Sequence, residues 1–225
     1  MNNRLKDISH KLIDSLSDGI FAIALTLLGL EVVSLVPEIS RSEDVLHSLQ
    51  EHLPVFSSFL LGFVVLFSWW YSYHATSQYV LNTTVVVVWS HGFTLMWVTL
   101  MPFAIAMLAQ TVDTPNLKWG VFFFSICLHG QYWTNLIVGG LGMIFKVDGL
   151  PRFAEDFPLD KEQVQKWIFL STIVFSVGGI LVTTLSLFYP LVSLGLCGLL
   201  ILSTFNPNQG FGRILSRSKK ANSNG

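Results

Sequence analysis

The sequence predicts an all-α polytopic membrane protein with six transmembrane helices, and three observations predict it. Charged residues make up 12% of the 225 residues, whereas an ordinary soluble domain contains about 25%. Three stretches contain no Asp, Glu, Lys or Arg: residues 52–112, 119–145 and 167–212. The basic residues are unevenly distributed among the segments that flank these stretches. Because a helix needs about 20 apolar residues to cross the hydrocarbon, the uncharged stretches predict membrane spans and exclude a soluble or disordered chain.

The first four spans are predicted in order along the chain. Span 1 covers residues 11–35, and no small-x-small cleavage site follows its apolar part, so it is expected to be retained rather than removed as a signal peptide. The first uncharged stretch is long enough for two spans, at 54–74 and 82–110. The second stretch predicts span 4 at 119–145.

The fifth and sixth spans come from one long apolar segment, residues 167–205. As a single helix it would be about 58 Å long, twice the thickness of the hydrocarbon. Pro190 lies in the middle of the segment, and proline breaks helices. The segment therefore predicts two spans, at 167–188 and 191–205.

The basic residues predict the orientation of this bundle. With six spans both termini lie on one side, which then carries 11 of the 13 Lys and Arg residues, against Arg41 and Lys118 on the other. Five spans would divide them 7 to 6, with no bias. The positive-inside rule therefore predicts that both termini are cytoplasmic. The spans predict a transmembrane domain at 1–210 in the cell membrane, followed by a polar cytoplasmic tail at 211–225. The net charge of −1 excludes a basic nucleic-acid-binding surface.

Span 1 differs from the others because it contains Asp14, Asp18 and Glu31. Acidic residues in a membrane are costly, so a helix that keeps them usually faces protein or water rather than lipid. An ordinary structural explanation is that Ser17 caps a helix that begins at Asp18. Helical spacing also gives span 1 an apolar stripe with Thr26 beside it, consisting of Leu16, Ile20, Ile23, Leu27, Leu30 and Ser34.

The motif in span 1 resembles a known signature. Residues 16–31 read LSDGIFAIALTLLGLE, which is similar to the Arg-x-x-x-Phe-Ser-Asp-Gly and Phe-Ala-Ile-x-x-Thr-Leu-Leu elements of the transmembrane-protein-175 family of potassium channels. Span 2 is similar through Trp70 and His74, and span 3 through Leu95 and the Pro102-Phe103 pair. The resemblance covers about the first half of the chain.

The resemblance implies a potassium-permeable channel without a carbonyl selectivity filter, and no Thr-Val-Gly-Tyr-Gly sequence occurs here. Single six-span units in the family form homotetramers around span 1, so a homotetramer is implied. By position, Ile23, Leu27 and Leu30 would form apolar rings that constrict the pore, and Thr26 would form a hydroxyl ring. Such rings control permeation by dewetting, and stripping water costs more for sodium than for potassium. Glu31 is expected at the outer mouth, where it would concentrate cations.

The resemblance also implies a structural polar cluster near the cytoplasmic end, formed by Ser17, Asp18, Gly19, Trp70, His74 and His91. This sequence departs from the family at four positions of that region: Leu12 replaces an Arg, Leu16 replaces a Phe, Tyr73 stands where His is common, and His91 stands where Asn is usual.

Three other classes of membrane protein are alternatives to a channel. An intramembrane enzyme would need a nucleophile–base pair or a metal, and His74, His91 and His129 lack the spacing of a metal motif. A secondary transporter would need broken helices, for which glycines at 139–142 and 178–179 are candidates, although small residues more often allow close packing. A purely structural membrane protein is the third alternative. The expected partners are K⁺ and other monovalent cations, the bilayer and further copies of the chain, with no enzyme activity, resident metal or cofactor.

Overall fold

The computed structural model describes residues 3–77, 85–144 and 161–204. These residues form eight α-helices and no strand, which confirms the all-α prediction. The helices are α1 (Asn3–Ser34), α2 (Val36–Arg41), α3 (Val45–Glu51), α4 (Leu53–Ser77), α5 (Val85–Thr111), α6 (Leu117–Ile144), α7 (Lys161–Ser186) and α8 (Pro190–Thr204).

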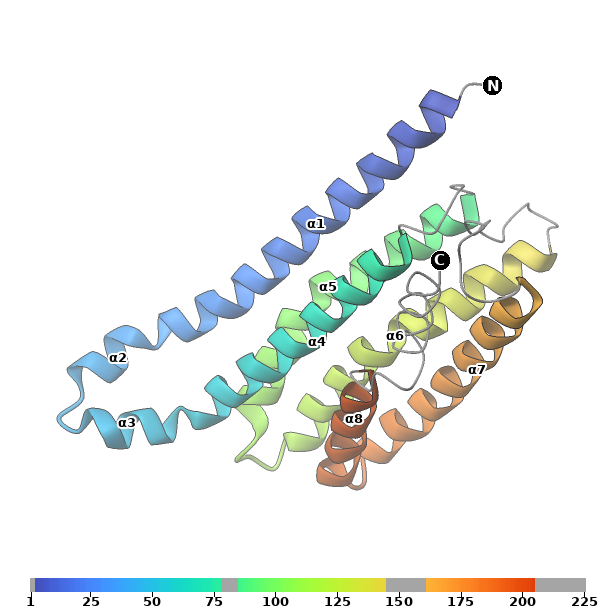
Figure 1. Cartoon of the computed structure of the whole chain (residues 1–225). Coiled ribbons are helices and arrows are strands. Elements are labelled where there is room, and N and C mark those ends of the chain that lie inside the picture. The colour runs from blue at the N-terminus through green and yellow to red at the C-terminus, as the bar shows by residue number, and fades with distance from the viewer. Residues whose placement is uncertain (1–2, 78–84, 145–160, 205–225) are drawn as a thin grey trace, which may run out of the picture.

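The helices form an elongated bundle in which α1 occupies one side (Figure 1). α1 packs against α4 and α5, and α5 connects this part of the bundle to α6. α7 and α8 pack against α6 on the opposite side. Within the described residues, the N-terminal helix therefore packs mainly against two of the other long helices and leaves much of its own surface uncovered.

The two short helices fill a segment that the sequence predicts as a loop, residues 36–53. Pro37 lies at the start of α2, where its missing N–H is not needed. Asp44 caps α3, because its carboxylate accepts a hydrogen bond of 3.0 Å from the backbone N–H of His47. Pro37 and the Asp44 cap favour two short helices here, and these helices reverse the chain between α1 and α4 (Figure 1).

The other helix boundaries lie close to the predicted spans where the structure describes them. α1 begins eight residues before the predicted residue 11, and α7 and α8 are separated by a turn at 187–189, next to Pro190. The predicted start of span 3 at residue 82 and the tail at 211–225 lie outside the described residues.

Three segments of the described residues are long and apolar enough to cross a membrane: Lys11–Arg41, Leu53–His74 and Val88–Thr111. Two shorter apolar helices cover Ile173–Ser186 and Pro190–Leu202. These segments support a multi-pass membrane protein, and the count of six crossings stays a prediction.

The core lies where α5 meets its neighbours. Val98, Met101 and Ile105 of α5 are almost fully buried. Gly62 of α4 allows a close approach to α5, since a Cβ at Gly62 would lie 2.8 Å from Cγ1 of Ile105. α4 and α5 therefore form a tightly packed pair that supports α1.

Candidate functional site

α1 has two different faces. Phe21, Ala24 and Leu28 are at most 2% exposed and pack in the core, whereas Ile23, Leu27 and Leu30 are 61%, 48% and 55% exposed. The alternation follows the helical period, so the exposed residues lie on the side that no other part of the described chain covers. This surface contains most of the stripe that the sequence predicts, whereas Ile20, the remaining member, is partly buried and packs against the core.

Thr26 also lies on the exposed side of α1. Its hydroxyl donates a hydrogen bond of 2.7 Å to the backbone carbonyl of Ala22. Because a hydroxyl has one hydrogen and two lone pairs, this bond uses the hydrogen and leaves the oxygen free to accept or to face a cation.

Asp18 links α1 to α4 through two aromatic side chains. Trp70 donates a hydrogen bond from Nε1 to Oδ1 of Asp18 at 3.0 Å, and Nε2 of His74 lies 3.2 Å from the same oxygen. The rings of Trp70 and His74 are themselves in contact, with centroids 4.5 Å apart. Three predicted members of the polar cluster are thus brought together.

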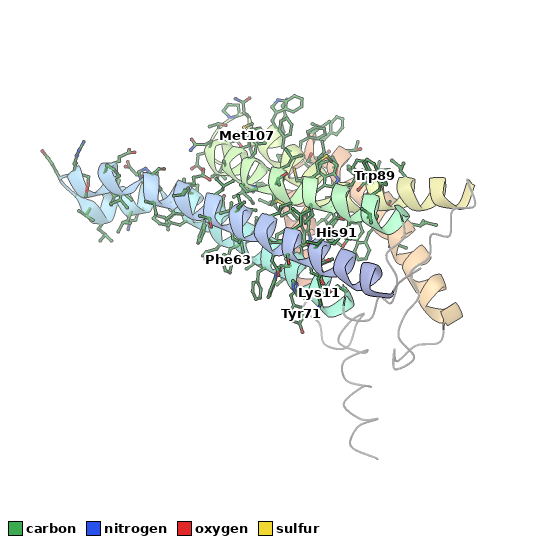
Figure 2. The ribbon with its side chains drawn as sticks, turned by 90° about the horizontal axis from the view of Figure 1, so that it is seen from above. Lys11, Phe63, Tyr71, Trp89, His91 and Met107 are labelled. Carbon is green, nitrogen blue, oxygen red and sulfur yellow. The ribbon has the colours of Figure 1, made fainter. Side chains whose placement is uncertain are left out.

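Ser17 links α1 to α5. Its buried hydroxyl donates to the carbonyl of Ile13 at 2.6 Å, and its oxygen lies 2.5 Å from Nε2 of His91. Since the carbonyl can only accept, the single hydroxyl hydrogen is committed to Ile13, and His91 is the donor to Ser17. Figure 2 shows His91 beside the half of α1 that carries Lys11.

The helix start that the ordinary structural explanation places at Asp18 is wrong, because α1 begins at Asn3. Ser17 lies inside the helix and bonds back to a carbonyl four residues earlier instead of capping a helix N-terminus. A buried serine inside a membrane helix uses this bond to satisfy its hydroxyl.

A second acid of α1 joins the cluster through a residue that the predicted set leaves out. The Tyr73 hydroxyl donates a 2.6 Å hydrogen bond to Oδ1 of Asp14. The Tyr73 ring stacks on His91, with centroids 4.4 Å apart and an interplanar angle of 22°. The spacing of Asp14 and Asp18, four residues apart, places both acids on one face of α1 but does not identify Tyr73 as the partner. The cluster is therefore larger than the predicted one, and it ties α1, α4 and α5 to each other.

Other predicted positions lie outside this cluster. Gly19 is exposed, and so are Leu12 and Leu16, which lie on the same side of α1 as Ile23. Glu31 is partly buried near the opposite end of α1, about 20 Å from Asp18 by the rise of a helix.

The three membrane histidines do not form one site. His74 and His91 belong to the polar cluster, whereas His129 is buried on α6, where its Nδ1 bonds to Ser125 and a Cβ at Gly179 of α7 would meet its ring. Within the described residues, no group of three or more His, Cys, Asp or Glu side chains is placed to hold a metal ion. α6 and α7 also run as continuous helices through the glycines proposed as breaks.

Comparison with known families gives a match to the family described as endosomal/lysosomal potassium channel TMEM175, over residues 13–102. This region contains the exposed stripe of α1 and all members of the polar cluster.

Three curated relatives are each named as a potassium channel. A protein of Chamaesiphon minutus is 33% identical over 55% of this chain and 64% of its own length. A protein of Streptomyces collinus is 31% identical over 44% of this chain and 47% of its own length. A protein of a Chryseobacterium species is 26% identical over 88% of this chain and 93% of its own length. The chain thus spans less than two thirds of the length of the first relative and about half of the length of the second.

A solved structure shows the same fold. The crystal structure of a lysosomal potassium-selective channel TMEM175 homologue from Chamaesiphon minutus superposes with a TM-score of 0.63 and 22% identity, covering 87% of this chain and 96% of that one. The predicted resemblance is thereby confirmed: residues 13–102 of this chain match the TMEM175 family, and most of the chain has the fold of the solved homologue.

Proposed function

We propose that this chain forms a potassium-permeable cation channel, in which four copies surround a pore lined by the exposed face of α1. The observation that carries the proposal is the division of α1 into a buried face and an exposed apolar stripe. The names of the curated relatives support potassium as the permeant ion. None of those relatives is named as an enzyme, which agrees with the prediction that this chain is not one.

The stripe suits a constriction rather than a coordination site. Rings of Ile23, Leu27 and Leu30 would narrow the pore and force an ion to shed water, a step that costs more for sodium than for potassium. A Thr26 ring would offer hydroxyl oxygens between the apolar rings, because each hydroxyl hydrogen is already bonded to Ala22. Selectivity built in this way is expected to be modest.

The polar cluster would hold the pore helix in place. Asp14, Ser17 and Asp18 fix one half of α1 to α4 and α5 by hydrogen bonds, and a fully satisfied network of this kind specifies one position of a helix. The positive-inside rule places this half toward the cytoplasm and Glu31 toward the outer mouth.

Flux through reconstituted protein tests the function. The purified chain should have the mass of a tetramer, and in liposomes it should carry passive potassium flux that exceeds sodium flux and shows single-channel current steps. A stable monomer without flux would overturn the proposal. Saturable uptake coupled to a second ion would instead identify a transporter.

Matched variants test the constriction. Ile23→Ala and Leu27→Ala should widen the pore and raise the sodium permeability relative to potassium. Ile180→Ala and Leu181→Ala are the controls, because these residues are 56% and 65% exposed and belong to α7, which lies on the opposite side of the bundle from α1 (Figure 1). Unchanged selectivity in both α1 variants would remove these residues from the filter.

A further inference from the structure

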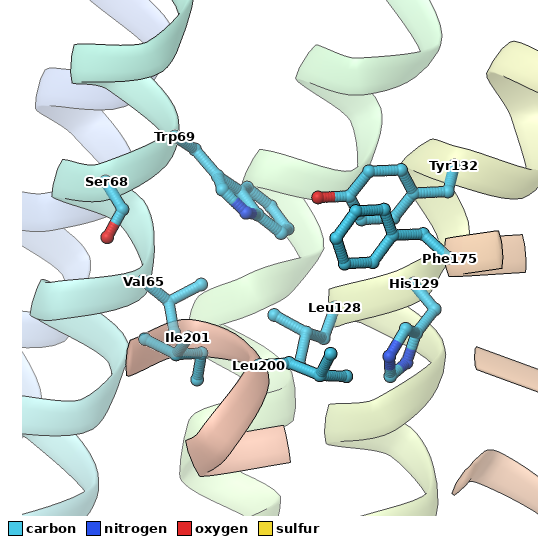
Figure 3. Close-up of a pocket in the computed structure, with 9 residues that line it drawn as sticks. All are labelled: Val65, Ser68, Trp69, Leu128, His129, Tyr132, Phe175, Leu200 and Ile201. Carbon is cyan, nitrogen blue, oxygen red and sulfur yellow. The ribbon is translucent and has the colours of Figure 1, made fainter. Parts of the chain in front are cut away.

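A small, partly open cavity lies in the other half of the bundle, away from α1. Its volume is about 30 Å³, and its lining comes from α4, α6, α7 and α8 (Figure 3). One water molecule needs roughly 10–15 Å³ of free cavity volume, so this cavity has room for about two water molecules. Most of the lining is apolar, including Val65 and Leu128. The side chains in the lining that carry a polar atom are those of Ser68, Trp69, His129 and Tyr132.

His129 lines this cavity and has an unpartnered ring nitrogen. The residue is 1% exposed, and its Nε2 has no hydrogen-bond partner among the residues that the structure describes. The other ring nitrogen, Nδ1, lies 2.9 Å from the backbone carbonyl of Ser125. A carbonyl only accepts hydrogen bonds, so Nδ1 carries the hydrogen. In the neutral ring Nε2 therefore has a lone pair and requires a donor.

The lining also limits the chemistry of that donor. Among the described residues that line the cavity there is no Asp or Glu, so none of them compensates a buried cation. An unsatisfied polar atom in the interior of a membrane domain is strongly destabilising, since no bulk water reaches it. The group that satisfies Nε2 must be small, neutral and a hydrogen-bond donor.

The Ser68 hydroxyl is a second hydrogen-bond acceptor in the lining of this cavity. Ser68 of α4 donates its hydroxyl hydrogen to the carbonyl of Val64, which leaves the lone pairs of its oxygen as acceptors. In Figure 3 the Ser68 hydroxyl lies on the opposite side of the cavity from the His129 ring. A bound water needs two to four polar partners, and these two atoms are acceptors from two different helices.

We propose that this cavity is an internal hydration site, in which one or two waters donate hydrogen bonds to Nε2 of His129 and to the Ser68 oxygen. The waters connect α4 to α6 inside each subunit. This site is independent of the proposed pore, because it uses no residue of α1.

Water-edited solid-state NMR on the full chain in liposomes tests the site. With ¹⁵N-labelled histidine, magnetisation from water should reach Nε2 of His129, and the spectrum should show hydrogen on Nδ1. A His129→Gln sample assigns the signal. His47, in the segment between the predicted spans 1 and 2, has a side chain that is 68% exposed and serves as the positive control for water contact. No transfer from water to His129, or hydrogen on Nε2 in place of Nδ1, would overturn the proposal.

A pair of serine variants tests the second partner. Ser68→Val removes the acceptor and fills space, so the transfer from water to His129 should be lost or strongly reduced. Ser57→Val on the same helix is the control, because Ser57 is exposed and lines no part of the cavity. If the transfer in a folded Ser68→Val protein equals that of the control, the assignment fails. The wild-type measurement stands by itself if the variant does not fold.

Discussion

Gly179→Ala is the substitution for which the structure gives the clearest expectation. A Cβ at this position of α7 would lie 2.7 Å from both Cβ and Cγ of His129 on α6. Ordinary van der Waals contact for such atoms begins near 3.4 Å, so the two helices would have to separate by about 0.7 Å or the histidine would have to move. His129 is fixed by its bond to Ser125, which favours helix separation. Overpacking of this kind costs about 1–3 kcal/mol.

The neighbouring glycine supplies a matched control. A Cβ at Gly178 would meet nothing within 4 Å. Both substitutions gain the same preference of alanine for a helix interior, about 1 kcal/mol over glycine. The difference between Gly179→Ala and Gly178→Ala therefore isolates the contact with His129.

Thermal unfolding of the purified protein in detergent measures this difference. For a chain of this size, 1 kcal/mol corresponds to roughly 2–4 °C in Tm. Gly179→Ala should therefore melt about 2–12 °C below Gly178→Ala. If the two variants have equal Tm values, or if Gly179→Ala is the more stable, the close approach of α6 and α7 at this point is refuted.

Two further predictions concern the polar cluster. Tyr73→Phe removes the donor to Asp14 and should lower the free energy of unfolding by about 1–3 kcal/mol, measured by denaturant or heat. Asp14→Asn should lower the free energy of unfolding less in the Tyr73→Phe protein than in the wild type, because the two residues share one hydrogen bond. Trp70→Phe removes the bond to the half-exposed Asp18 carboxylate and should cost about 1 kcal/mol, whereas Trp89→Phe, at an exposed position of α5, should leave the Tm unchanged. Equal Tm values for both tryptophan variants would contradict the role of Trp70.

The sequence predicts those features that depend on local pattern. Helical periodicity alone gives the stripe that contains Ile23 and Leu30, because an apolar helix in a bundle has a fixed angular period. The break near Pro190 follows from proline chemistry in the same way. The helices α2 and α3 were missed because each is shorter than eight residues and gives no sustained period.

Features that depend on distant partners could not be predicted from periodicity. The link between Tyr73 and Asp14 joins residues 59 positions apart, and nothing in the spacing within either helix specifies it. The contact of Gly179 with His129 has the same origin, since it depends on how α7 is rotated against α6. A glycine pair in an apolar run indicates close packing but does not say against what.

The two departures from the family in spans 2 and 3 are best understood as one change. The resemblance leads to the expectation of a His where this chain has Tyr73 and an Asn where it has His91. In the structure these two residues touch, with their rings stacked 4.4 Å apart. Each also bonds to α1, Tyr73 to Asp14 and His91 to Ser17. Because an aromatic pair adds stacking to its hydrogen bonds, the pair can hold α4, α5 and α1 together. If only one of these two residues were replaced, either Asp14 or Ser17 of α1 would lose a hydrogen-bond partner. The two residues are therefore expected to depend on each other.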